Sequence, residues 1–316
     1  MLKVRVVRKD IEALDICTVE FKSIDGRPLP AFSAGSHIDV HLPNGLIRQY
    51  SLCNAPSERH RYVIAVLKDP ATRGGSQAIH ELRTGDVLAI SEPRNHFLLA
   101  HNARRSLLFA GGIGVTPILC MAEGLAAIGE AFEMHYCSRS KERTAFIDRI
   151  LGAPFASQVS FHFDDGPPDQ RLDMNELLGF PEPETHVYVC GPKGFIEAVL
   201  KVARAVGWAE ANLHSEFFSA QQTKSDTDGS FEVMLASSRR LIVIPGDKTV
   251  VQALSEAGIE IATSCEEGVC GTCVTRVLEG QPDHRDFILT TEQQQLNDQF
   301  MPCCSRAVSE RLVLDL

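Results

Sequence analysis

The sequence predicts three folded domains in series: an antiparallel β-barrel, an α/β domain with a parallel sheet, and a smaller α+β domain at the C-terminal end. Three observations predict this order. Short β-rich runs fill residues 1–101, alternating strand and helix patterns fill residues 102–219, and spaced cysteines mark the block 231–316. At 316 residues the chain is long enough for two or three separate cores.

The first block consists of short strands separated by turns. Residues 37–42 alternate between apolar and polar side chains, which predicts a strand with one buried face. Turn residues such as Asn44-Gly45 and Gly85-Asp86 separate neighbouring runs. Six strands at this spacing predict a small antiparallel barrel. The runs cover residues 4–7, 16–24, 37–42, 49–53, 61–67 and 87–91.

The second and third blocks have different rhythms. Apolar runs begin near Leu107, Phe132, Val159, His186 and Leu213, with helix-compatible stretches between most of them, which predicts a doubly wound parallel sheet. Residues 220–230 are small and polar and are expected to form an interdomain linker. The last block opens with two β-like runs, 231–236 and 240–245, followed by a helix over 249–257 and a terminal strand at 312–314.

Charge and composition exclude several classes of function. A net charge of -10 and a pI near 5.6 argue against nucleic-acid binding, which requires a basic surface. We find neither a signal peptide nor an apolar stretch long enough to span a membrane, so a cytoplasmic location is expected. The ten cysteines are then expected to be ligands or core residues rather than disulfides.

The cysteine spacing carries the most specific chemical signal. Cys265-x4-Cys270-x2-Cys273, with a further cysteine about thirty residues later, is the spacing of plant-type 2Fe-2S sites. Soft thiolates suit iron-sulfur clusters. On spacing alone, Cys303 and Cys304 both remain candidates for the fourth ligand.

Two alternatives to a cluster remain at this point. A zinc site would favour paired C-x2-C units, of which the chain has one, and the cysteines could also be free thiols in the core. The ligand loop contains Gly268 and Gly271, which are expected to let the backbone bend and direct N–H groups at sulfur.

A glycine turn follows the apolar run 107–110. The residues Gly111-Gly112-Ile113-Gly114-Val115-Thr116-Pro117 predict a helix with Thr116 as its N-cap and Pro117 at its first position, with an N-terminus suited to an anion. A second turn, Cys190-Gly191-Pro192, ends a later strand at the same sheet edge, where ligands bind in such folds. An ordinary tight βα connection is the alternative for the first turn.

Together, Arg48-x-Tyr50-Ser51, Gly74-Gly75-Ser76, the two glycine turns and the cysteine loop resemble the ferredoxin-NADP reductase superfamily. The domain order resembles its phthalate dioxygenase reductase branch, which includes vanillate O-demethylase reductases. The resemblance implies an FMN-binding barrel at 1–101, an NAD-binding domain at 102–219 and a β-grasp 2Fe-2S ferredoxin domain at 231–316.

The resemblance also implies roles for individual residues. Cys303 is the match for the fourth cluster ligand. Phe218 would lie near the flavin ring and Cys190 beside the nicotinamide, although core packing of Phe218 and a structural role for Cys190 are alternatives. The remaining cofactor contacts fall on Arg48, Gln49, Tyr50, Ser51, Ala65, Val66, Leu67, Gly74, Gly75, Ser76, Gly111, Gly112, Gly114, Thr116, Pro117, Gly191 and Pro192.

The implied function is electron transfer from NADH through FMN and the cluster to a separate Rieske-type oxygenase. NADH is expected from the branch, whereas Arg139, after the second apolar run of the sheet, could hold the 2'-phosphate of NADPH or be an ordinary surface arginine. A reductase serving a haem monooxygenase and an iron-sulfur redox sensor are the alternative functions.

Overall fold

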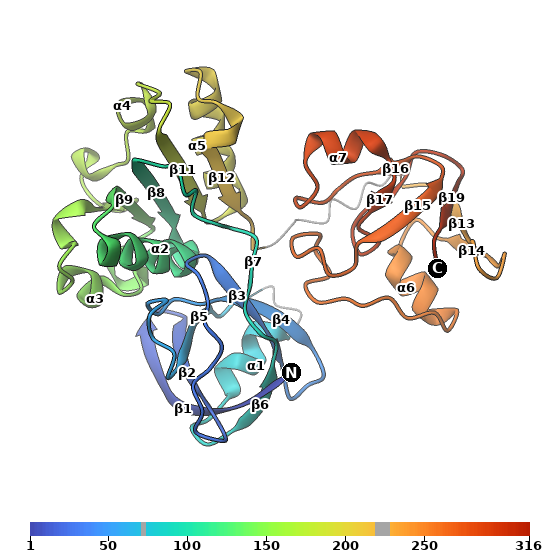
Figure 1. Cartoon of the computed structure of the whole chain (residues 1–316), viewed down its shortest axis with the longest axis horizontal. Helices are drawn as coiled ribbons and strands as arrows, with labels where there is room; N and C mark the ends of the chain where they lie inside the picture. Colours follow the sequence, from blue (N-terminus) through green and yellow to red (C-terminus); the bar gives the residue numbers. More distant parts are fainter. Residues whose placement is uncertain (71–73, 219–227) are drawn as a thin grey trace. The chain divides into compact units, whose positions relative to one another are not determined.

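The computed structural model describes residues 1–70, 74–218 and 228–316. These residues form two compact units, Met1–Glu216 and Phe217–Leu316 (Figure 1). Most of the predicted linker, 220–230, lies outside the described residues. In the part of the chain that is described, no helix is both long enough and apolar enough to cross a membrane.

The first sheet of the larger unit is the predicted antiparallel barrel. Its strand order is β4-β3-β6-β1-β2-β5, every pairing is antiparallel, and β4 also contacts β5. Alternate residues such as Val4, Val6 and Ile38 fill its core. Each of the six predicted runs is a strand. The elements are β1 (Leu2–Ala13), β2 (Ile16–Ser23), β3 (Ser36–His41), β4 (Ile47–Ser51), β5 (Tyr62–Leu67), α1 (Gly75–Glu81), β6 (Val87–Ile90) and β7 (Arg94–Asn95).

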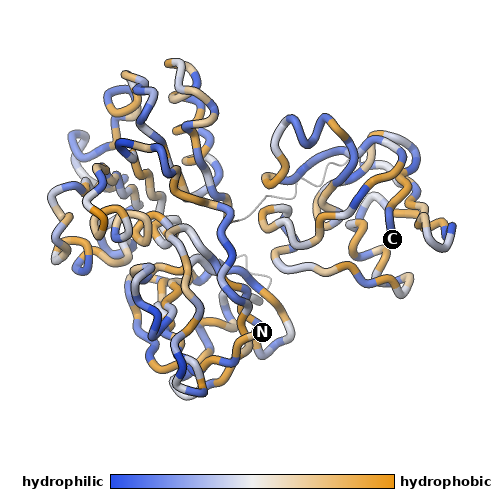
Figure 2. The backbone as a smooth tube through the Cα atoms, viewed as in Figure 1, coloured by the Kyte–Doolittle hydropathy of each residue, from blue (hydrophilic) through white to orange (hydrophobic). Residues whose placement is uncertain are grey.

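The second sheet is parallel throughout, with the order β10-β9-β8-β11-β12. All five predicted apolar runs are strands of this sheet. Figure 2 shows apolar residues gathered along these strands, and α2 covers one face of the sheet with buried residues such as Ile118 and Leu119. The elements are β8 (Arg105–Gly111), α2 (Val115–Ile128), β9 (Ala131–Ser138), α3 (Ile147–Leu151), β10 (Val159–Phe163), α4 (Met174–Leu178), β11 (Thr185–Cys190), α5 (Lys193–Ala205) and β12 (Leu213–Glu216).

The start of α2 differs from the expectation. Thr116 is not the N-cap, because a 3-10 turn over Gly112–Gly114 leads directly into the helix and makes Gly114 the cap residue. The Thr116 hydroxyl instead donates to the carbonyl oxygen of Ile113 at 3.2 Å. Pro117 still lies in the first turn, where its missing N–H costs no intrahelical hydrogen bond.

The smaller unit has the predicted β-grasp form, in which α6 packs on a mixed sheet of order β14-β13-β19-β15-β17. Thr249 and Gln252 form a capping box at the start of α6, which explains why the helix begins there. Both predicted opening strands and the terminal strand are present. The elements are β13 (Phe231–Leu235), β14 (Leu241–Ile244), α6 (Val250–Glu256), β15 (Thr275–Glu279), β16 (Pro282–Asp283), α7 (Thr291–Leu296), β17 (Gln299–Phe300), β18 (Arg306–Ala307) and β19 (Arg311–Leu314).

Candidate functional site

Two glycine turns meet at the carboxyl edge of the parallel sheet. They follow β8 and β11, which are neighbours with Ala110 opposite Cys190. A Cβ atom on Gly114 would lie 2.3 Å from the carbonyl oxygen of Cys190, and one on Gly191 would lie 2.9 Å from the Cα of Gly111. No side chain fits at these positions, so the two turns contact each other through their backbones.

A carboxyl, a hydroxyl and a thiol lie together beside these turns. Glu216 at the end of β12 is paired in register with Cys190 on β11, and the Ser51 Oγ of β4 donates to Glu216 Oε2 at 3.3 Å. Burial raises the pKa of Glu216 to about 8, although the Ser51 hydroxyl works against this shift. Burial, and then the nearby Glu216, raise the pKa of the Cys190 thiol well above its usual value. The side chains of Glu216, Ser51 and Cys190 are therefore largely uncharged near neutral pH.

The sequence had indicated Ser51 and Cys190 but not Glu216 as site residues. Glu216 does stand at the start of the Glu216-Phe217-Phe218 motif, so a signal was present. Its contact with Ser51 joins residues 165 positions apart, which strand periodicity cannot reveal. The structure thus adds Glu216 to the site.

Arg48 and the turn Gly74-Gly75-Ser76 lie together at the other end of β4. A Cβ atom on Gly75 would lie 2.8 Å from the Cγ of Arg48, so the arginine stem packs directly on this glycine. Gly74 has a φ of 93°, a conformation that favours glycine, and caps α1. Among the described residues Arg48 forms no ion pair; its one hydrogen bond goes to the carbonyl oxygen of Ile47. A guanidinium without a carboxylate beside a glycine turn fits a phosphate group.

Other predicted contacts lie on the same strands and turns. Tyr50 is half-buried against the barrel core, and burial raises the pKa of its hydroxyl. The Gln49 amide donates to Asp39 Oδ1 at 3.0 Å, so the Gln49 side chain is hydrogen-bonded within the barrel. On β5, Ala65 and Val66 are buried whereas Leu67 is exposed. The Ser76 hydroxyl accepts from the backbone N–H of Asp69 at 3.2 Å.

The smaller unit brings the four predicted sulfur ligands together. Cys265, Cys270, Cys273 and Cys303 are all buried. The Cys265 sulfur lies within hydrogen-bonding reach of Cys270 and Cys303, and that of Cys273 lies within reach of Cys303; these contacts lower the pKa values of Cys265 and Cys273. The Cys304 sulfur lies within hydrogen-bonding reach of the Cys303 sulfur. The geometry therefore favours Cys303 over Cys304 as the fourth ligand.

The ligand loop bends as expected at its glycines. Gly268 and Gly271 have φ values of 71° and 72°. Backbone N–H groups next to each glycine point at ligand sulfur: that of Glu267 donates to Cys265 Sγ at 3.3 Å, and that of Thr272 donates to Cys270 Sγ at 3.4 Å. Such donors stabilise thiolate charge.

The four thiols suit a two-iron cluster. A binuclear cluster needs only two thiolates at each iron, whereas a structural zinc ion needs four ligands around one centre. The four gathered thiols fit the ligand set of a 2Fe-2S cluster.

Comparison with known proteins identifies the family. Residues 233–308 match the family model described as 2Fe-2S iron-sulfur cluster binding domain. The chain is 56% identical over 318 residues to the vanillate O-demethylase oxidoreductase of Pseudomonas putida, covering 100% of both chains. The chain belongs to the phthalate dioxygenase reductase family. The solved phthalate dioxygenase reductase, whose title describes electron transfer from pyridine nucleotides to [2Fe-2S], is 39% identical with a TM-score of 0.78, covering 100% of this chain and 98% of that one.

A second solved structure places the same fold inside a longer protein. An intact type IV self-sufficient cytochrome P450 monooxygenase matches with a TM-score of 0.83 and 39% identity. The match covers 100% of this chain but 41% of the monooxygenase. The architecture of the phthalate dioxygenase reductase family therefore also occurs fused to a haem enzyme.

Two positions of this phthalate dioxygenase reductase family member bear on the cofactors. Phe218 is 37% exposed, and Phe217 stacks on Phe287 with ring centroids 4.5 Å apart. Arg139 is exposed after β9, and the backbone N–H groups of Asp164 and Asp165 donate to the carbonyl oxygens of Ser138 and Arg139. Asp164 and Asp165 thus lie beside Arg139, the residue that could bind the 2'-phosphate of NADPH.

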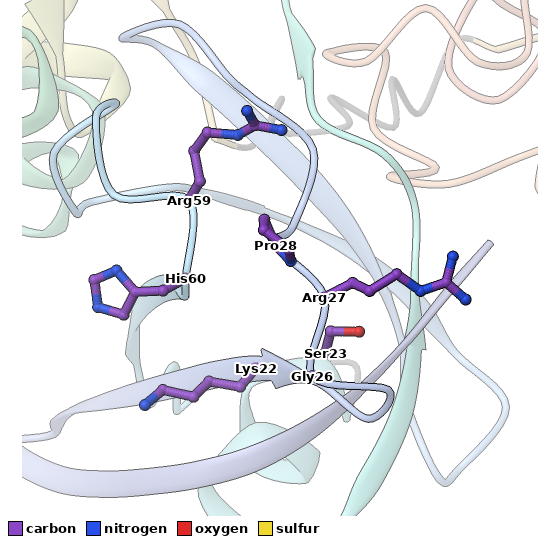
Figure 3. Close-up of a pocket in the computed structure, with 7 residues that line it drawn as sticks. All are labelled: Lys22, Ser23, Gly26, Arg27, Pro28, Arg59 and His60. Carbon is purple, nitrogen blue, oxygen red and sulfur yellow. The ribbon is translucent and has the colours of Figure 1, made fainter.

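A basic hollow on the reductase barrel belongs to none of these sites. It has a volume of about 500 Å³, and in Figure 3 the side chains of Lys22, Arg27 and Arg59 extend in different directions rather than toward a common point. None of its residues is among the predicted cofactor contacts. The lining residues are Lys22, Ser23, Gly26, Arg27, Pro28, Arg59 and His60.

Proposed function

We propose that this chain is the reductase component of a Rieske-type oxygenase system, passing electrons from NADH through FMN and a 2Fe-2S cluster to a separate oxygenase. The observation that carries the proposal is the presence, in one chain, of a nucleotide-type site at a parallel sheet edge and a four-thiol site suited to two irons. When bound, the flavin accepts an electron pair and releases the electrons singly, as a 2Fe-2S cluster requires.

The residues of the chain supply binding and positioning. Arg48 and the Gly74-Gly75 turn would hold the phosphate of FMN, and Ser51 and Tyr50 would contact its ring. The backbone of the two glycine turns would hold the pyridine nucleotide, with Cys190 beside the nicotinamide. Cys265, Cys270, Cys273 and Cys303 would ligate the cluster, and the partly exposed Phe218 would contact the flavin.

The proposed acceptor is an O-demethylating or aromatic-ring oxygenase. The support is the 56% identity to a vanillate O-demethylase oxidoreductase along the whole chain. A haem monooxygenase is the second candidate acceptor, favoured by the self-sufficient cytochrome P450 that contains this fold. Mixing the reduced protein with each candidate acceptor distinguishes the two. A Rieske oxygenase would convert its aromatic substrate, whereas a haem monooxygenase would show the absorption spectrum of reduced haem.

NADH is the proposed electron donor, and the cytoplasm the proposed location. Asp164 and Asp165 beside Arg139 support NADH, because carboxylates repel a 2'-phosphate and accept hydrogen bonds from a ribose 2'-hydroxyl. An iron-sulfur sensor remains the non-enzymatic alternative, and sustained NADH turnover with an artificial acceptor would discard it.

An anaerobic titration with NADH tests the proposal. We expect the visible flavin and iron-sulfur absorption bands both to bleach, and FMN to be recovered from the denatured protein. The same titration with NADPH serves as the control for donor preference. A protein without flavin, or one whose bands NADH does not bleach, would contradict the reductase function.

Glu216 is expected to give flavin reduction its pH dependence. With a pKa near 8, its carboxyl is neutral below pH 8 and charged above it. A charged carboxylate beside the hydride acceptor disfavours the added negative charge, so we expect the reduction rate to fall about tenfold per pH unit above 8. Rapid-mixing measurements of NADH-dependent flavin reduction between pH 6 and 10 would detect this fall.

Glu216→Gln is the matched test, because it keeps a neutral hydrogen-bonding group at Ser51. We expect this variant to reduce at a rate near that of the wild type at pH 7 and to lose the decline above pH 8. Replacement of the exposed Glu81 by Gln is the control and should keep the wild-type profile. An unchanged decline in Glu216→Gln would assign the pH dependence to another group.

A further inference from the structure

A fifth thiol lies inside the ligand loop of the predicted cluster. A Cβ atom on Gly268 would lie 2.3 Å from the Sγ of Cys304, so this sulfur occupies the space that a side chain at residue 268 would fill. Gly268 lies between the ligands Cys265 and Cys270. Cys304 therefore faces the loop that carries three of the four ligands, although the sulfur contacts favour Cys303 as the fourth.

The Cys304 sulfur is held only weakly where it lies. Its contacts with the Met301 carbonyl oxygen and the Ser305 hydroxyl are each 3.7 Å long. It also lies within hydrogen-bonding reach of the Cys303 sulfur. Sulfur hydrogen bonds of this length cost little to break, and a χ1 rotation moves Sγ without moving the backbone.

The backbone around the two cysteines allows a small adjustment. Backbone N–H groups of Cys304 and Ser305 both donate to the carbonyl oxygen of Met301, at 3.1 and 2.9 Å, which makes a tight turn at this point. The turn holds the two cysteines next to each other, with the Cys304 sulfur beside Gly268. Cys273, by contrast, has Thr272 and Val274 as neighbours and no adjacent thiol.

We propose that Cys304 is a reserve ligand, which takes the place of Cys303 at the cluster when the Cys303 thiolate is lost. In this exchange the iron–sulfur bond to Cys303 breaks and a bond to Cys304 forms. The proton released by the Cys304 thiol passes to the displaced Cys303 thiolate, or to solvent where residue 303 carries no thiolate, and no electron is transferred. The cluster keeps four thiolates and its net charge, so it survives the exchange. The inference rests on the 2Fe-2S site of the proposed function.

Alanine variants of the full-length protein test the exchange, because alanine offers no oxygen ligand. We expect anaerobically purified Cys303→Ala to retain at least about half of the wild-type iron and acid-labile sulfide, with an altered electron paramagnetic resonance spectrum after reduction. Cys304→Ala is expected to keep the wild-type spectrum. Cys303→Ala/Cys304→Ala is expected to lose the cluster, as is the matched control Cys273→Ala.

The outcomes separate this inference from the proposed function. A wild-type protein without iron would overturn both. A wild type with a cluster and a Cys303→Ala variant without one would overturn the reserve ligand alone, as would equal iron contents in Cys303→Ala and the double variant. Bound FMN reports whether the larger unit is intact in each preparation.

A second measurement applies if Cys303→Ala fails to fold. The cluster bands of wild type and Cys304→Ala are then followed in air with a thiol-alkylating reagent present. We expect Cys304→Ala to bleach at least about threefold faster, because no second thiol replaces a lost ligand. Equal bleaching rates would overturn the proposal.

Discussion

Cys270→Ala is expected to cut the electron path between the flavin and the protein acceptor. Cys270 is buried, its sulfur accepts from the backbone N–H of Thr272, and its neighbours Val269 and Gly271 carry no thiol. We expect the cluster bands to disappear and electron transfer to the oxygenase to fall below about 1% of the wild-type rate, because no cluster remains to carry electrons from the flavin to the protein acceptor. Iron analysis together with an oxygenase-coupled assay would measure both effects.

The Cys270→Ala variant should still transfer electrons from NADH to the flavin. NADH-dependent reduction of ferricyanide, which accepts electrons directly from reduced flavin, is expected to stay within about twofold of the wild-type rate. Cys17→Ala, which removes a buried thiol of the barrel, is the control and should keep the cluster. A Cys270→Ala protein with intact cluster bands would show that Cys270 is not a ligand.

Arg48→Ala is expected to weaken FMN binding about 10- to 150-fold. The guanidinium lies against Gly75, forms no ion pair within the described part of the chain, and would donate charge-assisted hydrogen bonds to the flavin phosphate. Loss of such bonds costs about 1.5–3 kcal/mol. Fluorescence titration of the flavin-free protein with FMN would measure the change in Kd.

Two further variants sharpen this test. Arg48→Lys keeps the positive charge but loses the two-pronged geometry, so its Kd should lie between those of the wild type and Arg48→Ala. Arg83→Ala removes an exposed arginine of the same barrel and should bind FMN as the wild type does. If Arg48→Ala bound riboflavin and FMN with unchanged relative affinity, Arg48 would not contact the phosphate.

The sequence predicted those parts of the fold that depend on local patterns. The alternation of residues 37–42 and the turns around them specify barrel strands, and every predicted strand of the parallel sheet is present. The start of α2 was wrong, because Thr116 followed by Pro117 is a typical helix-start pattern and the 3-10 turn before it leaves no mark in the sequence. Helix α1 was missed because the Gly74-Gly75 pair indicates a turn rather than a helix start.

The residues of the candidate site also fall into those that local sequence patterns indicate and those that only tertiary structure reveals. The cysteine spacing indicated the cluster because three ligands lie within nine residues of one loop. The contact of Ser51 with Glu216 depends on the packing of the barrel strand β4 against the end of β12, so it needs tertiary structure. Likewise, spacing left Cys303 and Cys304 open, and only the sulfur contacts with Cys265 and Cys273 favour Cys303.

The backbone contact between the two glycine turns limits how coenzyme choice can evolve. A methyl group on Gly114 or Gly191 would collide with the neighbouring turn, so these positions cannot acquire new side chains without separating β8 from β11. Variation is instead open at residues 138–140 and 164–165, which lie at the ends of the next strands outward, β9 and β10, and carry side chains already. Selection for a different pyridine nucleotide would therefore act on those loops while the two turns stay constant.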